Sequence, residues 1–171
     1  MTWTIRPLVE GDPRSSFTCG TQPQHHALDA WFHDHAWNYM AKKFATVFVA
    51  TPADGQIDGY YSLNAGSVPL DLLPTSERIR YPKHPVPVAH IGRLARHIRV
   101  RGQSLGGDLL VDAIRRAQRL AQSELGIAAM EVIAVDDKAR AFYERYGFVS
   151  LLDKTDHMYL SMKTVAKLKL T

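Results

Sequence analysis

The sequence predicts a mixed α/β domain built around one central sheet, and two observations carry this prediction. Short β-rich segments alternate with amphipathic helical segments along the chain. The run at 127–135 is almost continuously apolar, as in a strand that is covered on both faces. A chain of 171 residues can bury one core, so we expect a single domain over 1–171.

The first half of the chain predicts one helix and three strands. Apolar side chains recur at near-helical spacing in 25–41, which indicates an amphipathic helix. We expect strands at 4–10, 44–51 and 57–68, the last two joined as a hairpin through the turn residues PADG. The proline-studded segment 72–87 is expected as a surface loop.

The second half is more regular. Apolar residues lie on one helical stripe in 109–125, and Gly126 is expected to close this helix as its C′ residue. A shorter helix at 138–146 ends at Gly147 in the same way. Strands are expected at 88–98, 127–135, 148–152 and 157–165.

Composition limits the class of protein. The single cysteine, Cys19, excludes an internal disulfide framework and fits a reducing cytoplasm. No apolar run is long enough to span a bilayer, and the N-terminus lacks a signal-peptide pattern, so we expect a cytoplasmic protein. The net charge of +4 suits an anionic cofactor or RNA, although solvated surface is the alternative for any one basic cluster.

The run RVRGQSLGG at 99–107 lies between a predicted strand and a predicted helix. The first N–H groups of a helix have no internal partner and sit at the positive end of its dipole, so glycines there let a pyrophosphate approach. The chain has no Gly-Lys-Ser/Thr ending for a P-loop, and its glycine spacing does not match a dinucleotide fingerprint. By itself the run indicates either a phosphate site or an ordinary helix start.

A second motif is the run DDKARAFYERYGF at 136–148. Together with the loop, it resembles the GNAT family of acetyl-CoA-dependent N-acetyltransferases. Arg101 and Gly106 match the ends of the family's loop, and Tyr143 falls on its usual tyrosine. Ser104 stands where the family usually has glycine; we interpret it as an N-cap that needs no left-handed conformation. The resemblance implies a central, mostly antiparallel sheet flanked by helices, with the acetyl-CoA loop between the fourth strand and the following helix.

The resemblance also implies the roles of site residues. Tyr143 would act as general acid on the departing thiolate, since a phenol is protonated at neutral pH. Backbone groups of the strand would pair with the pantetheine arm, and one N–H would polarise the thioester carbonyl. No metal is expected. The residues implied to bind acetyl-CoA are Leu94, Ala95, Arg96, Arg101, Gly102, Gln103, Ser104, Leu105, Gly106, Gly107, Asp136, Ala139 and Phe142.

No general base stands out from the residues. His84, His90 and His97 flank the predicted active strand, and any of them could take a proton from an incoming amine. Surface or packing roles are the alternative for all three. The α-amino group of an aminoacyl ester is more acidic than a lysine side chain, so such a substrate needs less help from a base.

The first half of the chain sharpens the resemblance. FTCG at 17–20, followed by Leu28, Trp31 and Phe32, resembles the opening of the GNAT toxins of bacterial type II toxin–antitoxin pairs. That group acetylates the α-amino group on charged tRNA and thereby stops translation. It implies a small antitoxin partner with a ribbon–helix–helix half, and it allows a homodimer. Arg93 and Arg96 would steer the tRNA through phosphate contacts, while Cys19 would be a packed residue.

Two other classes of function are left open by the sequence. An ordinary GNAT enzyme would acetylate a small-molecule amine or a protein amine and would leave charged tRNA untouched. A non-catalytic acetyl-CoA-binding module would hold the cosubstrate without transferring its acetyl group.

Overall fold

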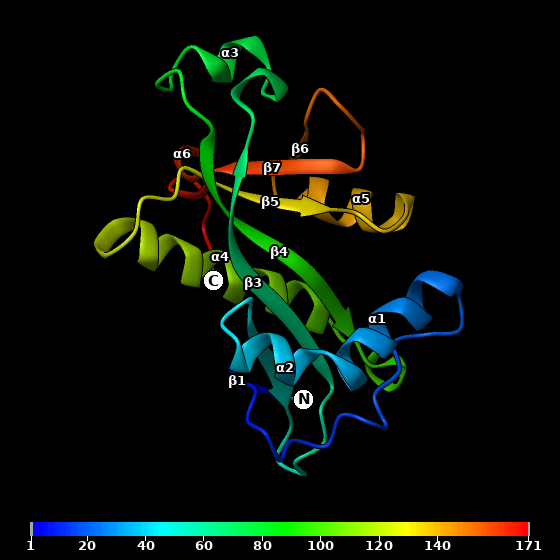
Figure 1. Cartoon of the computed structure of the whole chain (residues 1–171). Helices are drawn as coiled ribbons and strands as arrows, with labels where there is room; N and C mark the ends of the chain where they lie inside the picture. Colours follow the sequence, from blue (N-terminus) through cyan, green and yellow to red (C-terminus); the bar gives the residue numbers. More distant parts are fainter. Residues whose placement is uncertain (1, 171) are drawn as a thin grey trace. The chain divides into compact units, whose positions relative to one another are not determined.

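The computed structural model describes residues 2–170, and its strands and helices are shown in Figure 1. Among these residues, seven strands follow the hydrogen-bonded order β1-β2-β3-β4-β5-β7-β6. β4 and β5 run parallel, whereas the β1–β2, β2–β3, β5–β7 and β6–β7 pairs are antiparallel. The predicted mixed, mostly antiparallel sheet flanked by helices is therefore confirmed.

The chain forms two compact units, and each unit combines two separate stretches of sequence. The first unit contains Met1–Asn64 and Gly92–Ala113, and the second contains Ala65–Ile91 and Ile114–Thr171. Three elements have residues in both units: β3 (Gly59–Val68), β4 (Val86–Arg96) and α4 (Leu105–Ser123).

The first unit is built on an aromatic core. The ring of Phe32 stacks on that of Tyr60 at 4.2 Å between centroids, and Phe17 meets both rings edge-on at 5.1 and 5.4 Å. All three side chains are buried. Stacked and edge-on contacts of this kind are the arrangements that aromatic pairs favour. The elements wholly within this unit are β1 (Thr4–Pro7), α1 (Pro23–Asp34), α2 (Ala36–Ala41), β2 (Thr46–Thr51) and η2 (Ile98–Val100).

The helix predicted over 25–41 is two helices. His35 has a φ of −122° and separates α1 from α2, although its backbone N–H still bonds the carbonyl of Trp31 at 2.8 Å. The apolar spacing continues across this break because Trp31, Phe32 and Ala36 all enter the same core. Hydrophobic periodicity reports the buried face and so could not reveal the interruption.

The second unit packs its own apolar cluster, which includes Val68, Leu73, Val88, Leu151 and Tyr159. Its wholly contained elements are η1 (Leu70–Leu72), α3 (Thr75–Arg78), β5 (Ala129–Ile133), α5 (Asp137–Arg145), β6 (Val149–Ser150), β7 (His157–Ser161) and α6 (Met162–Val165). The segment expected as a loop at 72–87 thus contains the short helix α3.

Two helix ends differ from the expectation. α4 stops at Ser123, three residues before Gly126, which lacks a left-handed φ and so is not a C′ cap. The strand expected to continue to 165 ends at Ser161, whose hydroxyl accepts a hydrogen bond from the Thr164 N–H at 3.1 Å and caps α6. Gly147, by contrast, follows α5 with a φ of +96°, as a C′ glycine should.

No helix within the described part of the chain is both long enough and apolar enough to cross a membrane.

Gly20 holds the entry to α1, and its replacement provides a test of this local geometry. The glycine has a φ of +156°, and a Cβ placed there would lie 2.2 Å from Nδ1 of His25. That same nitrogen accepts a hydrogen bond from the Gln22 N–H at 3.2 Å. The ring of His25 therefore fills the space that a side chain at position 20 would need.

We expect Gly20→Ala to lower the free energy of unfolding by about 2 kcal/mol, since overpacking typically costs 1–3 kcal/mol. Urea unfolding followed by circular dichroism measures this loss. Gly126→Ala is the matched control, because a Cβ at Gly126 meets nothing within 4 Å. Equal stabilities of the two variants would contradict the close packing of the His25 ring against Gly20.

Candidate active site

The glycine-rich turn connects β4 to α4 in the first unit. Gly102 and Ser104 have φ values of +83° and +62°, so both lie in the left-handed region. The expectation that Ser104 avoids this conformation is therefore wrong. The turn must reverse the chain between η2 and α4, and a positive φ at position 104 explains why glycine would suit it better.

The turn presents the start of α4 to solvent. Arg101, Gly102, Gln103 and Ser104 are exposed, whereas Leu105 is fully buried. The Ser104 carbonyl accepts the first helical hydrogen bond, from the Asp108 N–H at 3.2 Å. By helix geometry, the N–H groups that precede Asp108 in α4 have no helical acceptor. This turn can therefore hold an anion, and Leu105 can contribute to that site only through its backbone.

A buried carboxylate fixes the approach to the turn. Asp58, at 1% exposure, accepts hydrogen bonds from Trp3 Nε1 at 2.9 Å and from Arg99 Nε at 2.6 Å. Its backbone carbonyl also accepts from the His97 N–H at 2.6 Å. Arg99 therefore has a structural partner, unlike the arginines that lie near it in the sequence at positions 93, 96 and 101.

Arg93, Arg96 and Arg101 of the first unit have no carboxylate partner among the described residues. The guanidinium of Arg93 lies over the ring of Trp31, 4.2 Å from its centroid. Burial lowers the pKa of Arg93, and burial together with the nearby charge of Arg101 lowers the pKa of Arg96. These uncompensated positive charges suit a phosphorylated ligand.

Tyr143 lies on α5 in the second unit. Asp136 caps this helix by accepting a hydrogen bond from the Ala139 N–H at 2.8 Å, so both motif residues help to start α5. Tyr143 is 6% exposed and packs edge-on against Phe142 and Phe148. Burial raises its pKa far above the ordinary value for a phenol, so the hydroxyl keeps its proton at neutral pH.

The Tyr143 hydroxyl is available to a ligand. It makes no hydrogen bond with any described residue. It is also not among the fully buried polar atoms without a partner, so it is not completely enclosed. A phenol that is held by packing, protonated and unpartnered can donate a proton to a reacting atom.

Cys19 is buried, as expected, and is not a nucleophile. Its N–H donates to Oδ1 of buried Asp29 at 3.0 Å, and its thiol donates to the His25 carbonyl at 3.6 Å. Burial, together with the charge of Asp29, raises the pKa of the thiol to about 12. The FTCG segment therefore builds the entry to α1.

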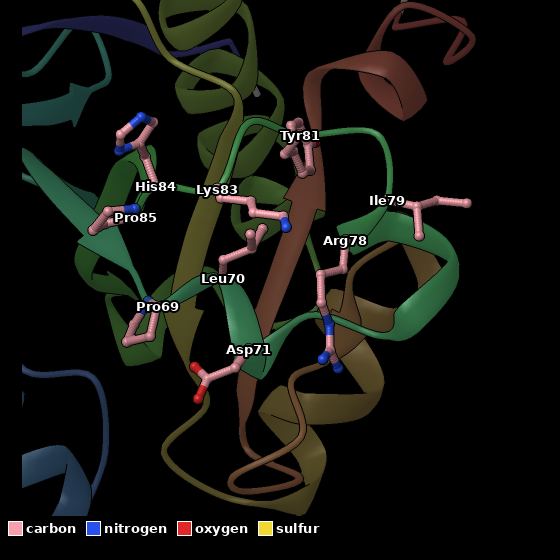
Figure 2. Close-up of a pocket in the computed structure, with 9 residues that line it drawn as sticks. All are labelled: Pro69, Leu70, Asp71, Arg78, Ile79, Tyr81, Lys83, His84 and Pro85. Atoms are coloured by element: carbon pink, nitrogen blue, oxygen red, sulfur yellow. The ribbon is translucent and has the colours of Figure 1, made fainter.

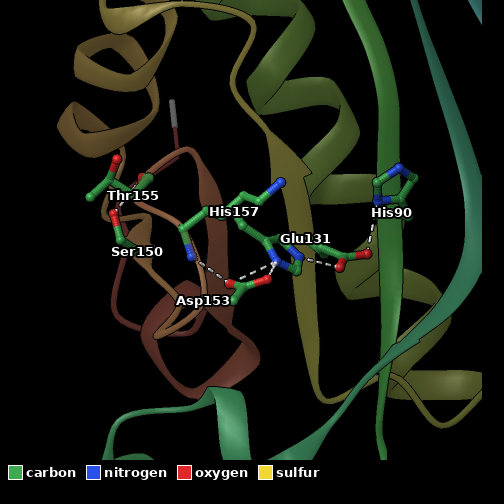
Figure 3. Close-up of polar contacts among 7 residues, drawn as sticks. His90, Glu131, Ser150, Asp153, Thr155 and His157 are labelled. Atoms are coloured by element: carbon green, nitrogen blue, oxygen red, sulfur yellow. Dashed lines mark hydrogen bonds and ion pairs between the residues drawn. The ribbon is translucent and has the colours of Figure 1, made fainter.

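The structure distinguishes the three histidines near β4. His97 accepts a hydrogen bond from the Arg99 N–H at 3.1 Å and packs edge-on against Phe17, so it has a structural role. His84 lies in the connection before β4. His90 bonds Glu131, which in turn bonds His157 (Figure 3). The sequence interpretation missed Glu131, although a lone carboxylate in the apolar run IAAMEVIAV was a visible signal.

A pocket of about 760 Å³ also opens in the second unit (Figure 2). Its lining comes from the segment between β3 and β4: Pro69, Leu70, Asp71, Arg78, Ile79, Tyr81, Lys83, His84 and Pro85. None of the residues predicted to bind acetyl-CoA lines it.

Among the described residues, no three His, Cys, Asp or Glu side chains lie together in a way that could hold a metal ion.

The conformation of Ser104 yields a testable difference. A left-handed φ costs a residue with a Cβ about 1–2 kcal/mol, so Ser104→Gly should be about 1 kcal/mol more stable than Ser104→Ala. Thermal or urea unfolding of the purified variants measures the difference. At exposed Arg119 inside α4 the order should reverse, with Ala about 1 kcal/mol better than Gly. The same order at both positions would contradict the turn geometry.

Structural comparison reveals close neighbours of this fold. A tyrosine-to-phenylalanine mutant of KacT superposes with a TM-score of 0.88 at 23% identity, covering 98% of this chain and 99% of its own. AtaT complexed with acetyl-methionyl-tRNAfMet superposes with a TM-score of 0.87 at 24% identity, covering 97% of this chain and 98% of its own. At these identities the likeness establishes the fold.

Sequence comparison adds closer relatives. The tRNA-acetylating toxin of Mycobacterium tuberculosis is 36% identical over 160 residues, which cover 92% of this chain and 91% of the toxin. The probable toxin TacT of Sinorhizobium fredii is 31% identical over 96% of this chain and 93% of its own. Residues 12–148 match the Acetyltransferase (GNAT) family. The chain therefore belongs to the GNAT acetyltransferase family.

Proposed function

We propose that this protein is a toxin that transfers the acetyl group of acetyl-CoA to the α-amino group of aminoacyl-tRNA and thereby blocks translation. The observation that carries the proposal is the 36% identity, over 92% of the chain, to a tRNA-acetylating toxin. The whole chain, 1–171, would act as one acetyltransferase domain in the cytoplasm.

The first unit would hold acetyl-CoA, which supplies an activated acetyl group as a thioester. The α4 N–H groups and Arg101 would bind the pyrophosphate, together with the turn residues Gly102 to Gly107. Backbone groups of Leu94, Ala95 and Arg96 would pair with the pantetheine arm. The register between β4 and β5 ends at Ile91↔Val132 although β4 continues to Arg96, which supports this use of the later residues.

The second unit would supply the acid. Tyr143 would donate its proton to sulfur as the C–S bond breaks, while the amine nitrogen forms the new N–C bond and loses a proton. The packing around Tyr143 and its raised pKa support a donor that is always protonated. Phe142 would contact the cosubstrate beside it.

Arg93 and Arg96 would position the tRNA through its phosphates. Both are half-buried and have no carboxylate partner among the residues that the structure describes, which leaves their charges for a polyanion. AtaT has been solved bound to the C-terminus of the antitoxin AtaR, and KacT in a KacTA–DNA complex. By analogy, the partner of this chain would be a small antitoxin with a ribbon–helix–helix half. A homodimer of this chain would be a further assembly.

Cell-free translation tests the proposed function. The protein, acetyl-CoA and charged tRNA would be incubated together, the protein removed, and the tRNA added to a ribosome extract. We expect translation to fall only when all three components were present. Full translation after complete incubation, together with acetylation of small amines or peptides, would instead indicate an ordinary GNAT enzyme.

Replacing Tyr143 by phenylalanine should remove the acid while preserving the packing. We expect turnover to fall at least 100-fold, in line with the loss of general acid catalysis, with acetyl-CoA affinity within about twofold of wild type. Turnover assays and calorimetric titration measure the two quantities. Weaker binding with normal turnover would remove Tyr143 from this role.

Gly106→Asp should weaken acetyl-CoA binding at least 10-fold, because a carboxylate at the start of α4 repels the pyrophosphate. Titration calorimetry measures the affinity, with Gly126→Asp as the matched control beyond the end of α4. Unchanged affinity in Gly106→Asp would move the phosphate site away from this turn.

A further inference from the structure

A series of cation–π and aromatic contacts runs from β4 to the turn after α2, wholly within the first unit. The guanidinium of Arg93 lies 4.2 Å from the ring centroid of Trp31. Trp31 meets Tyr39 edge-on at 5.3 Å between centroids, and Tyr39 meets Phe44 edge-on at 6.1 Å. These four side chains, Arg93, Trp31, Tyr39 and Phe44, form the aromatic row.

Trp31 anchors the aromatic row to the core. It is 5% exposed, and its ring stacks on that of Tyr60 at 6.0 Å between centroids. Nε1 of Trp31 is buried and has no hydrogen-bond acceptor among the described residues, a state that folded proteins rarely keep. Phenylalanine would avoid this cost, but tryptophan is the ring that holds a cation best. Trp31 therefore serves as a support for the Arg93 guanidinium.

Phe44 is the exposed end of the aromatic row. At the end of α2, the Phe44 N–H donates to the Tyr39 carbonyl at 2.9 Å and the Lys43 N–H to the Met40 carbonyl at 3.2 Å. This is the Schellman arrangement, which brings the side chains of Tyr39 and Phe44 together. Lys43 has the left-handed φ of +64° that the arrangement requires. Phe44 is nevertheless 70% exposed, so most of its ring is open to a ligand.

The charges beside the aromatic row are positive and unpaired. Lys42 and Lys43 are exposed, and neither has a carboxylate partner among the described residues. The same holds for half-buried Arg93. The hydroxyl of half-buried Tyr39 makes no hydrogen bond with a described residue. This surface of the first unit thus combines ring faces with positive charge.

Such a combination is typical of surfaces that hold single-stranded nucleic acid. Unpaired bases stack on aromatic rings and on arginine guanidinium planes, while lysine and arginine charges follow the phosphates. A protein-binding surface would contain few lysines, since Lys is depleted at such interfaces. An unpaired nucleotide strand therefore matches both the rings and the charges of the aromatic row.

The Arg93 end of the aromatic row lies beside the strand residues proposed to hold acetyl-CoA. Arg93 directly precedes Leu94 on β4, about 3.3 Å along the strand. In the proposed function, the pantetheine arm pairs with Leu94 to Arg96 and the pyrophosphate lies at the turn 101–107. The adenine of acetyl-CoA then lies at the far end of the cosubstrate, and its thioester lies toward Arg93.

We propose that the aromatic row stacks the unpaired bases at the 3′ end of aminoacyl-tRNA and thereby brings the α-amino group to the thioester. This inference rests on the proposed function and gives it a binding surface. Arg93 contacts the nucleotide that carries the amino acid, with the plane of its guanidinium as well as its charge. Tyr39 and Phe44 contact the nucleotides that precede it.

Phe44 is the residue to vary, because its exposed ring contributes little to the core. We expect Phe44→Ala to raise KM for aminoacyl-tRNA about 10-fold, with kcat and KM for acetyl-CoA within about twofold of wild type. Phe44→Leu should behave as Phe44→Ala, since leucine restores bulk without a π face, whereas Phe44→Tyr should retain most of the affinity. Val9→Ala is the matched control, because Val9 is 55% exposed in the same unit and outside the aromatic row.

Arg93→Lys separates stacking from charge. Lysine keeps the positive charge but has no flat face to place between Trp31 and a base. We expect KM for aminoacyl-tRNA to rise about 10-fold while its dependence on salt concentration stays as in wild type. Thermal melting and acetyl-CoA affinity show whether the variant is folded. A folded Arg93→Lys enzyme with the wild-type KM would contradict the stacking role of Arg93.

The substrate offers the complementary change. Chemically charged tRNAs that lack one base among the unpaired 3′ nucleotides should raise KM of the wild-type enzyme about 10-fold at the position that Phe44 contacts. The same tRNA should cause little further loss in Phe44→Ala, because the contact is already absent. Equal losses in both enzymes at every position would overturn the proposal.

The outcomes for the two proposals are distinguishable. A folded Phe44→Ala enzyme with the wild-type KM overturns the aromatic row alone, and a changed sedimentation coefficient in that case assigns Phe44 to a contact between copies. If wild-type protein acetylates only free amines, the proposed function fails, and fluorescence anisotropy of labelled tRNA decides on the aromatic row. Affinity lost in Phe44→Ala and retained in Phe44→Tyr supports it, whereas wild-type protein that binds no tRNA overturns both proposals.

Discussion

The ion pair between buried Asp58 and Arg99 is the constraint on which the first unit depends. One carboxylate binds Trp3 from the N-terminus and Arg99 from η2, and the adjoining carbonyl binds the His97 N–H. These bonds fix where β4 ends and therefore where the glycine turn begins. A buried charge that lost its partner would cost several kcal/mol, so this arrangement is held firmly. Arg93, Arg96 and Arg101 have no such partner among the described residues, and the proposed function assigns their charges to a phosphorylated ligand.

Function in this chain follows from a division between satisfied and unsatisfied polar groups. Asp58, Asp29 and Asp136 are bound to the backbone or to side chains of the fold, and each fixes an element or a turn. The hydroxyl of Tyr143 has no such partner among the described residues. Folded proteins pair most of their shielded polar groups, and in the proposed function the unpaired Tyr143 hydroxyl donates its proton to the leaving sulfur.

The sequence could predict what local rules determine. Asp136 begins α5 and Gly147 follows its end, as the motif indicates, and the mixed sheet follows from alternating helices and apolar runs. It could not reveal that Ser104 is left-handed, because the rest of the turn imposes that conformation against the preference of serine. The break at His35 was hidden by a continuous apolar face. The contact between Glu131 and His157 depends on strand register across 26 residues, which no local pattern encodes.

The central claim is that charged tRNA is the acetyl acceptor. The most direct measurement is transfer of label from radiolabelled acetyl-CoA to total charged tRNA, with deacylated tRNA and free amino acids assayed beside it. The account predicts label on charged tRNA alone, released with the acetylated amino acid when the ester bond is hydrolysed. Label on free amines or peptides, with none on charged tRNA, would contradict it.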